Sequence, residues 1–206
     1  MDAISPWNVV PAADYERYMG PEGLDQLATL SAIFQETYLG AQPDRLLVLG
    51  CGPGVGLEHV DPGVTRRVVA VDLNLQYLMV ARQRFMHLGA KLELHCKDAL
   101  KFEASPESFD LIDAALIFEH LHPEVLVRAI SGWLAPHGAC GVVLELPGGG
   151  GPPPPTPALA AVVQGEHRVS PEELVHLFDH YGLTLRRQRE ERVKFERKLW
   201  VGHFGR

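Results

Sequence analysis

The sequence predicts an α/β protein in which helices cover both faces of a doubly wound, mostly parallel sheet of seven strands. Short aliphatic runs alternate with stretches of helical periodicity through the middle of the chain. Runs such as 46–49 and 68–71 are apolar at every position, as expected for parallel strands that are buried on both sides. Two further runs, 183–193 and 198–204, flank a short polar turn and predict a C-terminal antiparallel hairpin.

The chain has 206 residues, of which 46% are apolar and 22% are charged, and this fits a single domain that folds in water. No apolar run approaches the length of a membrane span, and residues 1–6 lack the pattern of a secretory signal. Cys51, Cys96 and Cys140 form no C-x-x-C pair, so we expect neither a disulfide nor a metal site. These features predict a cytoplasmic protein without a membrane partner.

The charge distribution disfavours nucleic acid as a partner. The formal net charge is −7, which opposes a broad grip on phosphate backbones. The most basic segment, 186–198, has acidic residues between its arginines and lysines, a pattern that favours a solvated strand face.

Residues 1–43 are predicted to form an N-terminal helical cover. A short helix is expected over 12–19. A longer helix is expected from Pro21, which suits a first helical position, to Gly40, a common type of helix stop. The apolar residues of this longer helix recur at steps of three and four: Leu24, Leu27, Leu30, Phe34 and Tyr38.

Residues 44–146 hold the predicted parallel core. One helix follows Asn74, which suits an N-cap, and ends at Gly89, and another spans 123–134. Helices between successive strands supply the crossover connections that parallel pairing needs. The strands of this core are expected at 46–49, 68–72, 92–96, 109–116 and 140–146.

The rest of the same domain divides into a loop over 147–169 and a C-terminal helix and hairpin over 170–206. The loop begins with four glycines and four prolines, so no regular element is expected at 148–157. Its place after the fifth strand fits a lid over the ligand-binding edge and fits a surface linker equally well. The sequence Ser-Pro-Glu-Glu at 170–173 is a capping box that starts a helix ending at Gly182.

The glycine-rich segment after the first strand is the strongest functional signal. It reads Leu-Gly-Cys-Gly-Pro-Gly-Val-Gly at 49–56, and glycine lets the backbone turn sharply and lie against a ligand. The dinucleotide pattern G-x-G-x-x-G fails, because Val55 and Leu57 stand where its third glycine is needed. The phosphate-binding pattern G-x-x-x-x-G-K-[ST] is also absent. The absence of the two patterns disfavours a dinucleotide site and a phosphate-binding loop of the nucleotide-hydrolase type.

Carboxylates follow two neighbouring strands of the predicted sheet. Asp72 ends the second strand, and Asp98 follows the third. Ligands of open α/β sheets bind beyond the carboxyl ends of the strands, so both side chains should face one crevice together with the glycines. A carboxylate in the place of Asp72 can accept two hydrogen bonds from a ribose diol, which predicts a ligand that contains adenosine.

Taken in order, these segments resemble the motifs of class I S-adenosylmethionine-dependent methyltransferases. The resemblance covers roughly residues 44–146, and its specificity lies in the order and spacing of short motifs. It implies a Rossmann-like fold, S-adenosylmethionine as the cofactor and S-adenosylhomocysteine as its product. Besides the glycine-rich segment, the motifs are Val-Asp-Leu-Asn at 71–74, Lys-Asp-Ala at 97–99, Phe-Asp-Leu-Ile at 109–112, Phe-Glu-His-Leu at 118–121 and Trp-Leu-Ala-Pro-His-Gly at 133–138.

The resemblance also implies which residues hold the amino-acid part and the ribose of the cofactor. Gly50, Cys51, Gly52 and Gly54 would pass under the methionine part. Asp72 would bind the ribose hydroxyls. Cys51 is more typical of a small filler than of a nucleophile.

The adenine and the methyl group would lie between residues of later motifs. Leu73 would pack on the adenine ring, Asp98 would meet the adenine amino group, and Ala99 would supply a backbone contact. Ala115 and Leu116, at the tip of the fourth strand, would face the side that carries the methyl group.

The sequence departs from the family pattern at two positions of the glycine-rich segment. The family usually has an acidic residue two positions before the first glycine, where this chain has Val48, and Pro53 replaces a common threonine. The missing carboxylate would weaken the grip on the cofactor's amino-acid end, unless Tyr15 or Tyr18 replaces it. Packing of the N-terminal helix onto the sheet is the favoured role for both tyrosines.

His120 is the candidate catalytic residue. It follows the tip of the fourth strand, where substrate and methyl group should meet, and an imidazole can take a proton from a hydroxyl or an amine. A packing role with a hydrogen bond to the backbone explains His120 equally well. His167 is a weaker candidate on the substrate side, and Asp110 and Asp113 are predicted to be structural.

The expected function is methyl transfer from S-adenosylmethionine to a small-molecule O, N or C nucleophile. Two alternatives stay open: an accessory protein that binds the cofactor without turnover, which Val48 makes thinkable, and a methyltransferase that acts on a protein. A nicotinamide dehydrogenase is disfavoured by the failed dinucleotide pattern. We expect a monomer or a homodimer.

Overall fold

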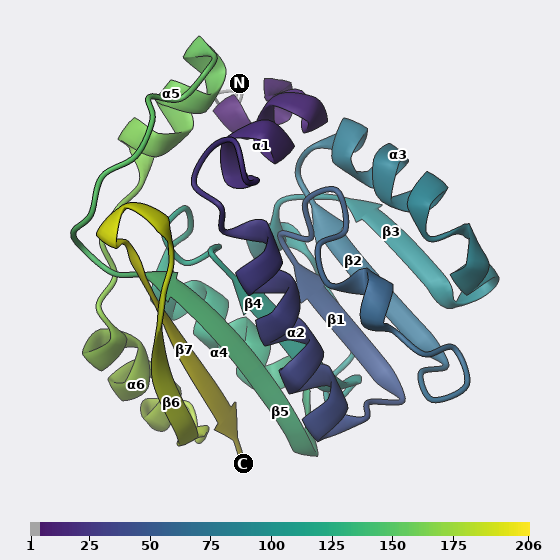
Figure 1. Cartoon of the computed structure of the whole chain (residues 1–206). Coiled ribbons are helices and arrows are strands. Elements are labelled where there is room, and N and C mark those ends of the chain that lie inside the picture. The colour runs from purple at the N-terminus through teal and green to yellow at the C-terminus, as the bar shows by residue number, and fades with distance from the viewer. Residues whose placement is uncertain (1–4) are drawn as a thin grey trace.

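Seven strands form a single sheet in the computed structural model of the protein, which describes residues 5–206 (Figure 1). The strand order is β3-β2-β1-β4-β5-β7-β6; β1 to β5 are parallel, and β7 is antiparallel to both β5 and β6. The predicted seven-stranded, mostly parallel sheet with a C-terminal antiparallel hairpin is confirmed. The strands are β1 (Arg45–Leu49), β2 (Arg67–Asp72), β3 (Leu92–Cys96), β4 (Phe109–Ala115), β5 (Leu134–Glu145), β6 (Thr184–Arg192) and β7 (Lys198–Gly205).

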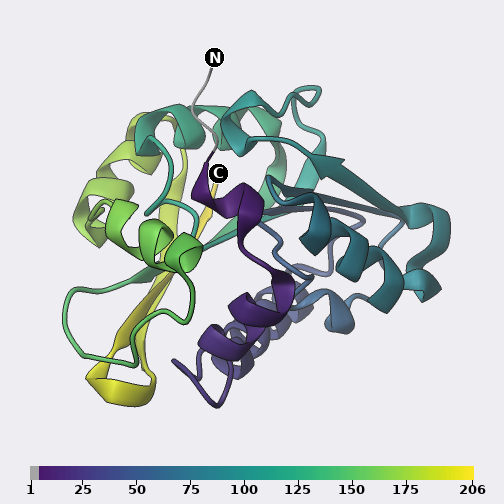
Figure 2. The ribbon, with the colours of Figure 1, turned by 90° about the horizontal axis from the view of Figure 1, so that it is seen from above.

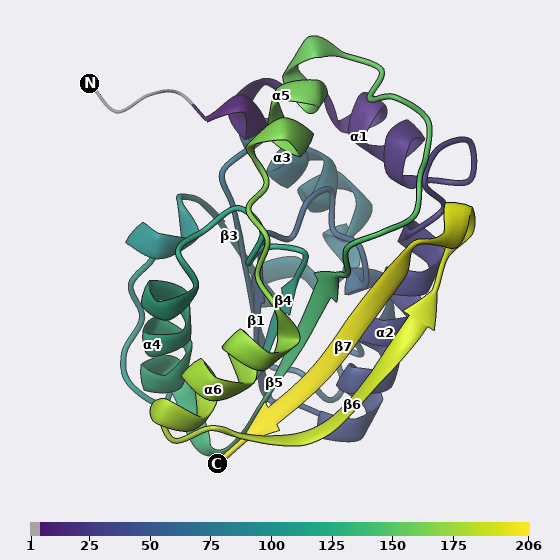
Figure 3. The ribbon, with the colours of Figure 1, turned by 90° about the vertical axis from the view of Figure 1, so that its left-hand side faces the viewer.

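Helices cover both faces of this sheet (Figure 3). Leu46 and Val48 of β1 pack toward α2 and α3, whereas Leu47 and Leu49 pack toward α4 and α6. Because both sets are buried, the strand reads as an unbroken apolar run in the sequence. The helices on the two faces are α2 (Leu27–Ala41) and α3 (Leu75–Arg84) on one, and α4 (Pro123–Trp133) and α6 (Pro171–His180) on the other.

A cover made from distant parts of the chain lies over the carboxyl ends of the parallel strands (Figures 1 and 2). It consists of the short 3-10 helix η1 (Pro6–Val9), α1 (Ala12–Met19) and α5 (Pro157–Gly165), and α5 packs against η1. The cover predicted over 1–43 is described from Ser5 on, and residues 1–4 lie outside the described residues. The remaining 3-10 helices are η2 (Leu57–His59), η3 (Met86–Lys91), η4 (Ala99–Lys101) and η5 (Lys194–Glu196).

The predicted start and end of the long N-terminal helix are wrong. The helix begins at Leu27 rather than Pro21, because residues 21–24 form a turn between α1 and α2. It continues through Gly40 and ends where Gln42 adopts a left-handed conformation with φ 44°. Neither this helix nor any other helix within residues 5–206 is long and apolar enough to cross a membrane.

Residues 148–156 hold no helix or strand, in line with the prediction for 148–157, but the second half of the loop predicted over 147–169 contains α5 from Pro157 on. Thr156 caps α5 by accepting from the Leu159 N–H at 3.3 Å. The glycine-rich half is anchored rather than free, since the Gly150 N–H donates to the Phe195 carbonyl at 2.9 Å. Two other boundaries also shift: α3 ends at Arg84, before Gly89, and β5 begins at Leu134 rather than at residue 140.

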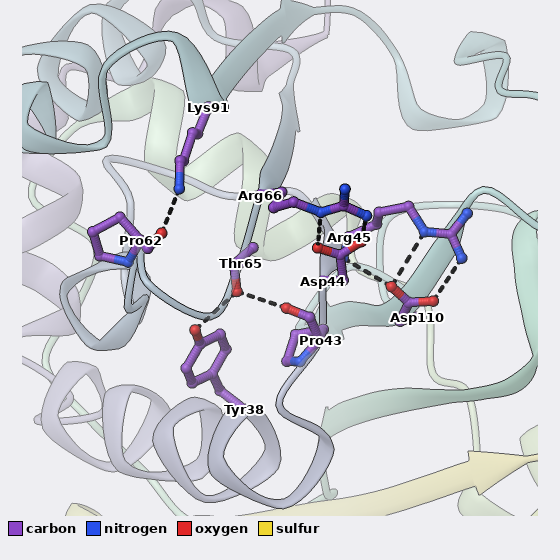
Figure 4. A network of polar contacts seen from close by, with 9 residues as sticks. All are labelled: Tyr38, Pro43, Asp44, Arg45, Pro62, Thr65, Arg66, Lys91 and Asp110. Atoms are coloured by element: carbon purple, nitrogen blue, oxygen red, sulfur yellow. Dashed lines mark hydrogen bonds and ion pairs between the residues drawn. The ribbon is translucent and has the colours of Figure 1, made fainter.

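The opposite edge of the sheet, at the amino ends of the strands, is held by polar contacts (Figure 4). The Tyr38 hydroxyl hydrogen-bonds to Thr65 Oγ1 at 2.8 Å, and Thr65 donates to the Pro43 carbonyl at 2.7 Å. Arg45 forms an ion pair with Asp110 at 2.6 Å. Asp110 is therefore structural, as predicted, and it joins the starts of β1 and β4 far from the cover.

Candidate active site

A cavity of about 380 Å³ lies between the carboxyl ends of the parallel strands and the cover. Open α/β sheets bind ligands at this edge, and the volume lies within the range of small-molecule sites. Its walls come from the loops after β1, β2, β3 and β4, and its roof comes from η1, α1 and α5. The fold thus brings residues from both ends of the chain onto one site.

The glycines of the segment after β1 have two different roles. Gly50 and Gly52 line the cavity, with φ of 65° and 54°, and an added Cβ at Gly52 would meet nothing closer than Tyr15 at 3.7 Å. Gly54 does not line the cavity: a Cβ there would approach the Phe85 ring to 2.4 Å. Gly54 therefore permits close packing of the loop on α3, and bare backbone faces the cavity at Gly50 and Gly52.

Cys51 lines the cavity but is buried, and burial raises the pKa of its thiol well above the usual value. A thiol kept protonated in this way is a poor nucleophile. The structure agrees with the predicted role of Cys51 as a small filler.

Asp72 ends β2 with its carboxylate held toward the glycine-rich segment. Oδ2 accepts from the Gly52 N–H and Oδ1 from the Asn74 N–H, both at 2.8 Å. Burial raises the pKa of Asp72 to about 6, although the hydrogen bonds from Asn74 and Gly52 lower it. Each oxygen has further lone pairs, so the carboxylate can accept more hydrogen bonds from a ligand. Leu73, the next residue, also lines the cavity.

The residues predicted to surround the adenine and the methyl group lie on the same cavity: Asp98, Ala99, Ala115 and Leu116. Asp98 Oδ1 accepts from the Leu100 N–H at 2.9 Å, and this cap orients the side chain. Leu116 has a φ of 51°, which a branched residue rarely adopts. Its N–H donates to the Val143 carbonyl at 2.9 Å, and this hydrogen bond holds the strained backbone directly after the end of β4.

A buried carboxylate lies beside the position of the missing acidic residue. Val48 of β1 is the register partner of Asp113 of β4, and both side chains line the cavity. Asp113 is 7% exposed, and burial raises its pKa to about 7. The sequence predicted a structural role for Asp113, but its place on the cavity wall makes it a candidate for ligand binding.

Tyr15 and Tyr18 both line the cavity from α1, so each can contact a ligand as well as pack on the sheet. The Tyr15 ring lies over Gly52 and tilts against the Tyr77 ring, with centroids 5.4 Å apart. Burial raises the pKa of Tyr15, which leaves its hydroxyl protonated and able to donate a hydrogen bond.

The structure separates the two candidate histidines. His120 lines the cavity with its ring edge-on to Trp7, at a centroid distance of 5.1 Å. Burial lowers the pKa of His120 to about 4, so the imidazole is neutral at pH 7 and a weak base. His167 lies outside the cavity lining, with its N–H bonded to the Glu119 carbonyl and Nε2 at 2.8 Å from the Leu121 carbonyl. His167 therefore fixes the connection between α5 and α6.

Sequence reasoning missed a group of polar residues at the roof end of the cavity. They are Gln26, Glu119, Glu145, Glu166 and Arg197. Glu145 pairs with Arg197 and accepts from Gln26 Nε2 at 2.9 Å. These residues come from five separate segments, so no spacing in the sequence connects them. One signal in the sequence could have pointed to this group: Glu119, the acidic residue directly before His120 in the motif at 118–121.

Known proteins share this domain and this fold. Residues 46–138 match the sequence profile of a family described as "Methyltransferase domain". The fold is similar to that of the N-methyltransferase NodS from Bradyrhizobium japonicum WM9 in complex with S-adenosylhomocysteine, at a TM-score of 0.70 and 16% identity over 90% of this chain and 89% of that one. No curated protein matches the sequence significantly.

Two further solved structures share the fold. One is a putative sarcosine dimethylglycine methyltransferase from Galdieria sulphuraria, with a TM-score of 0.67 and 11% identity over 87% of this chain and 86% of that one. The other is a phosphoethanolamine N-methyltransferase from Haemonchus contortus in complex with phosphomonomethylethanolamine and S-adenosylhomocysteine. Its TM-score is 0.68 at 16% identity, over 94% of this chain and 56% of that one.

Proposed function

Because residues 46–138 form an S-adenosylmethionine-dependent methyltransferase domain within a class I methyltransferase fold, we propose that this protein transfers a methyl group to a small molecule. The observation that carries the proposal is a cavity at the switch point of the sheet that is lined by Gly50, Gly52 and Asp72 and covered by the roof. The named acceptor of the H. contortus relative and the name of the G. sulphuraria relative, both small molecules, support this choice.

The residues on the cavity fit S-adenosylmethionine. Gly50 and Gly52 line the cavity with bare backbone; an added Cβ would crowd Ile117 at 3.1 Å from Gly50 and would take up free space at Gly52, so glycine suits a ligand that lies against the chain. Asp72 offers free lone pairs to the ribose hydroxyls, and Asp98 offers its second oxygen to the adenine amino group. Asp113 replaces, on the neighbouring strand, the carboxylate that Val48 lacks, and it suits the positively charged ammonium of the methionine part.

When bound, the cofactor supplies a methyl group activated by a sulfonium. The protein's own residues then have to bind the acceptor, orient it and exclude water. The roof of η1, α1 and α5 covers the cavity for this purpose. Leu116 and Ala115 set the floor against which the acceptor lies, and a proton acceptor is required if the nucleophile is protonated.

The first experiment is a binding measurement. Purified protein is expected to bind S-adenosylhomocysteine with micromolar affinity, about −8 kcal/mol, in isothermal titration calorimetry. NADH, titrated under the same conditions, should give no heat, because the segment after β1 lacks the dinucleotide glycine pattern. Heat with NADH and none with S-adenosylhomocysteine would contradict the proposal.

A second candidate function is cofactor binding without turnover, and its only support is Val48, which stands where the family usually has an acidic residue. One measurement, the fate of the bound cofactor, distinguishes the two functions. A methyltransferase releases S-adenosylhomocysteine from S-adenosylmethionine in the presence of an acceptor, whereas an accessory protein binds the cofactor and leaves it intact.

The roof is also expected to act as a lid whose movement centres on the proline half of the loop. The four prolines at 152–155 lie between the anchored Gly150 and the cap residue Thr156. Replacing 152–155 by Gly-Ser-Gly-Ser should leave the fold and the affinity for S-adenosylhomocysteine nearly unchanged, because the glycines and the cap remain. It should speed hydrogen exchange of the α5 amides, measured by mass spectrometry, with α4 as the internal control. Loss of cofactor binding would instead make the segment part of the binding site.

A further inference from the structure

The roof end of the cavity carries three glutamates, and their charges are not equally balanced. Glu145 forms an ion pair with Arg197 and a hydrogen bond with Gln26. Its charge is therefore compensated within the protein. Glu119 and Glu166 line the same end without an ion-pair partner among residues 5–206.

Glu119 is buried, and half of its carboxylate is unsatisfied. Its Oε1 accepts from the Glu145 N–H at 2.8 Å, which fixes the side chain on the cavity wall. Its Oε2 has no hydrogen-bond partner within the described residues, although the side chain is only 8% exposed. A buried polar atom without a partner is costly, so this oxygen is poised to accept from a ligand.

Glu166 approaches the same space from the roof. It follows the last residue of α5, and the next residue, His167, donates its N–H to the Glu119 carbonyl at 2.9 Å. This contact holds the end of α5 close to the loop after β4. Burial raises the pKa of Glu119 to about 7. Glu166 is exposed at the edge of the cavity, and partial desolvation together with the charge of Glu145 raises its pKa to about 7, whereas Arg197 lowers it. Each pKa would fall if a cation lay between the two carboxylates.

The walls around this acidic end are apolar. Leu24 from the turn after α1 and Leu159, Val162 and Val163 from α5 line it. An acceptor that fits the space has a short apolar body and one polar end directed at Glu119 and Glu166. A positive charge suits that end best, because an anion would be repelled and a neutral hydroxyl would leave the buried Glu119 carboxylate without a counter-charge.

We propose that the methyl acceptor is an amine with a short apolar body, bound as its ammonium ion between Glu119 and Glu166. The inference rests on the proposed methyl transfer and names the substrate class of the same site. Glu119 has a second role in it. One N–H proton moves from the ammonium to Glu119 Oε2, and the nitrogen gains the lone pair that methyl transfer needs.

The atoms and charges of the reaction balance. The nitrogen–methyl bond forms as the carbon–sulfur bond of the sulfonium breaks, so the positive charge passes to the methylated nitrogen. S-adenosylhomocysteine leaves as the demethylated product. The proton on Glu119 goes to solvent, which gives one proton released per methyl group transferred.

The test uses three probes with the same apolar body and different ends: hexylamine, 1-hexanol and hexanoate. Binding to the full-length protein is measured by calorimetry with and without S-adenosylhomocysteine. Hexylamine is expected to bind on the order of tenfold or more tightly than 1-hexanol, because it makes charged hydrogen bonds to the carboxylates. Hexanoate should not bind. Methyl transfer to hexylamine from labelled S-adenosylmethionine is the second readout.

Variants locate the effect. Glu119→Gln keeps the Oε1 acceptor for the Glu145 N–H but removes the charge, so it should fold normally and lose most of the preference for hexylamine. Glu166→Gln should lose part of it. Glu190→Gln on β6, which alters an exposed ion pair with Lys198 of β7, is the matched control and should keep the preference. Affinity for S-adenosylhomocysteine reports separately that each variant still holds the cofactor.

The outcomes are distinct. A preference for hexylamine that Glu119→Gln abolishes and Glu190→Gln retains supports the proposal. Equal binding of hexylamine and 1-hexanol to a protein that binds S-adenosylhomocysteine overturns the amine proposal and leaves the methyltransferase function standing. Failure to bind S-adenosylhomocysteine overturns the proposed function and, with it, the proposal that rests on it.

Discussion

Replacing Asp72 by alanine is expected to weaken the binding of S-adenosylhomocysteine by about 1.5–3 kcal/mol, the usual loss for hydrogen bonds to a charged group. This corresponds to roughly a ten- to hundredfold rise in Kd. The reason is the place of the carboxylate at the end of β2, where it can accept from both ribose hydroxyls. The change also removes the acceptors of the Gly52 and Asn74 N–H groups, so the glycine-rich segment loses support. Calorimetry on the folded variant measures the effect.

Asp110→Ala is the matched control, because it removes a carboxylate that pairs with Arg45 at the opposite edge of the sheet. Its effect on cofactor affinity should be small. Asp113 is unsuitable as a control, although the sequence predicted a structural role for it, since its side chain lines the cavity. Equal losses from the Asp72 and Asp110 variants would show that the ribose site lies elsewhere.

The shifted pKa of Asp72 adds a pH dependence with a defined sign. Burial raises the pKa from its ordinary value of 3.8 to about 6, so the carboxylate is ionised above pH 6 and protonated below it. The ionised form accepts the stronger hydrogen bonds, and the affinity should therefore fall as the pH drops through 6. Without ligand, the folded state holds this proton more tightly than the unfolded chain. The contribution of Asp72 to stability is thus present below pH 3.8 and lost as the pH rises through 6.

Replacing Phe178 by alanine is expected to lower the free energy of unfolding by about 3–5 kcal/mol, the range for removing a large aromatic residue from a core. The Phe178 side chain is fully buried. Its ring stacks on Phe204 of β7 at a centroid distance of 4.0 Å and meets the edge of Phe118 at 6.1 Å. The ring thereby joins α6 to the sheet and to the loop that carries Glu119, so a cavity here would loosen both contacts.

Denaturant unfolding followed by circular dichroism measures this effect. Met86→Ala is the control, since Met86 is 72% exposed and its truncation should change the free energy of unfolding by no more than about 0.5 kcal/mol. A loss below about 1 kcal/mol for Phe178→Ala would mean that α6 does not pack on the sheet in this way. Cofactor affinity of the folded variant shows whether the loop before Glu119 is disturbed as well.

Local sequence patterns were sufficient for the sheet and for many of the residues that line the cavity. The runs 46–49 and 92–96 were recognised because strand burial leaves a local signature of apolar or alternating residues. Asp72 and Asp98 could be placed on the cavity because Asp72 ends β2 and Asp98 comes two residues after the end of β3, both strands of predicted direction. Asn74 was recognised as a helix cap for the same reason: its side chain accepts from the Gln76 N–H two residues on.

Where the sequence misled, a contact outside the local pattern decided the outcome. Pro21 suits a helix start, but the Leu24 N–H donates to the Tyr18 carbonyl at 2.6 Å and closes a turn instead. Gly54 looks like a ligand-binding glycine, but its backbone packs under Phe85. Each of these residues permits two local conformations, and packing against another segment selects one of them.

By itself, the sequence determined the fold class, the strand directions and the glycine backbone and carboxylates at the carboxyl ends of the strands, because neighbours in the chain set each of these. The tertiary structure alone brought together the polar residues of the proposed acceptor side. Glu119, Glu145, Glu166 and Arg197 lie on four segments that meet only when β7 pairs with β5 and α5 folds over the sheet. The function proposed for their charges depends on their mutual distance and on the burial of Glu119, and both are properties of the folded chain that no spacing in the sequence encodes.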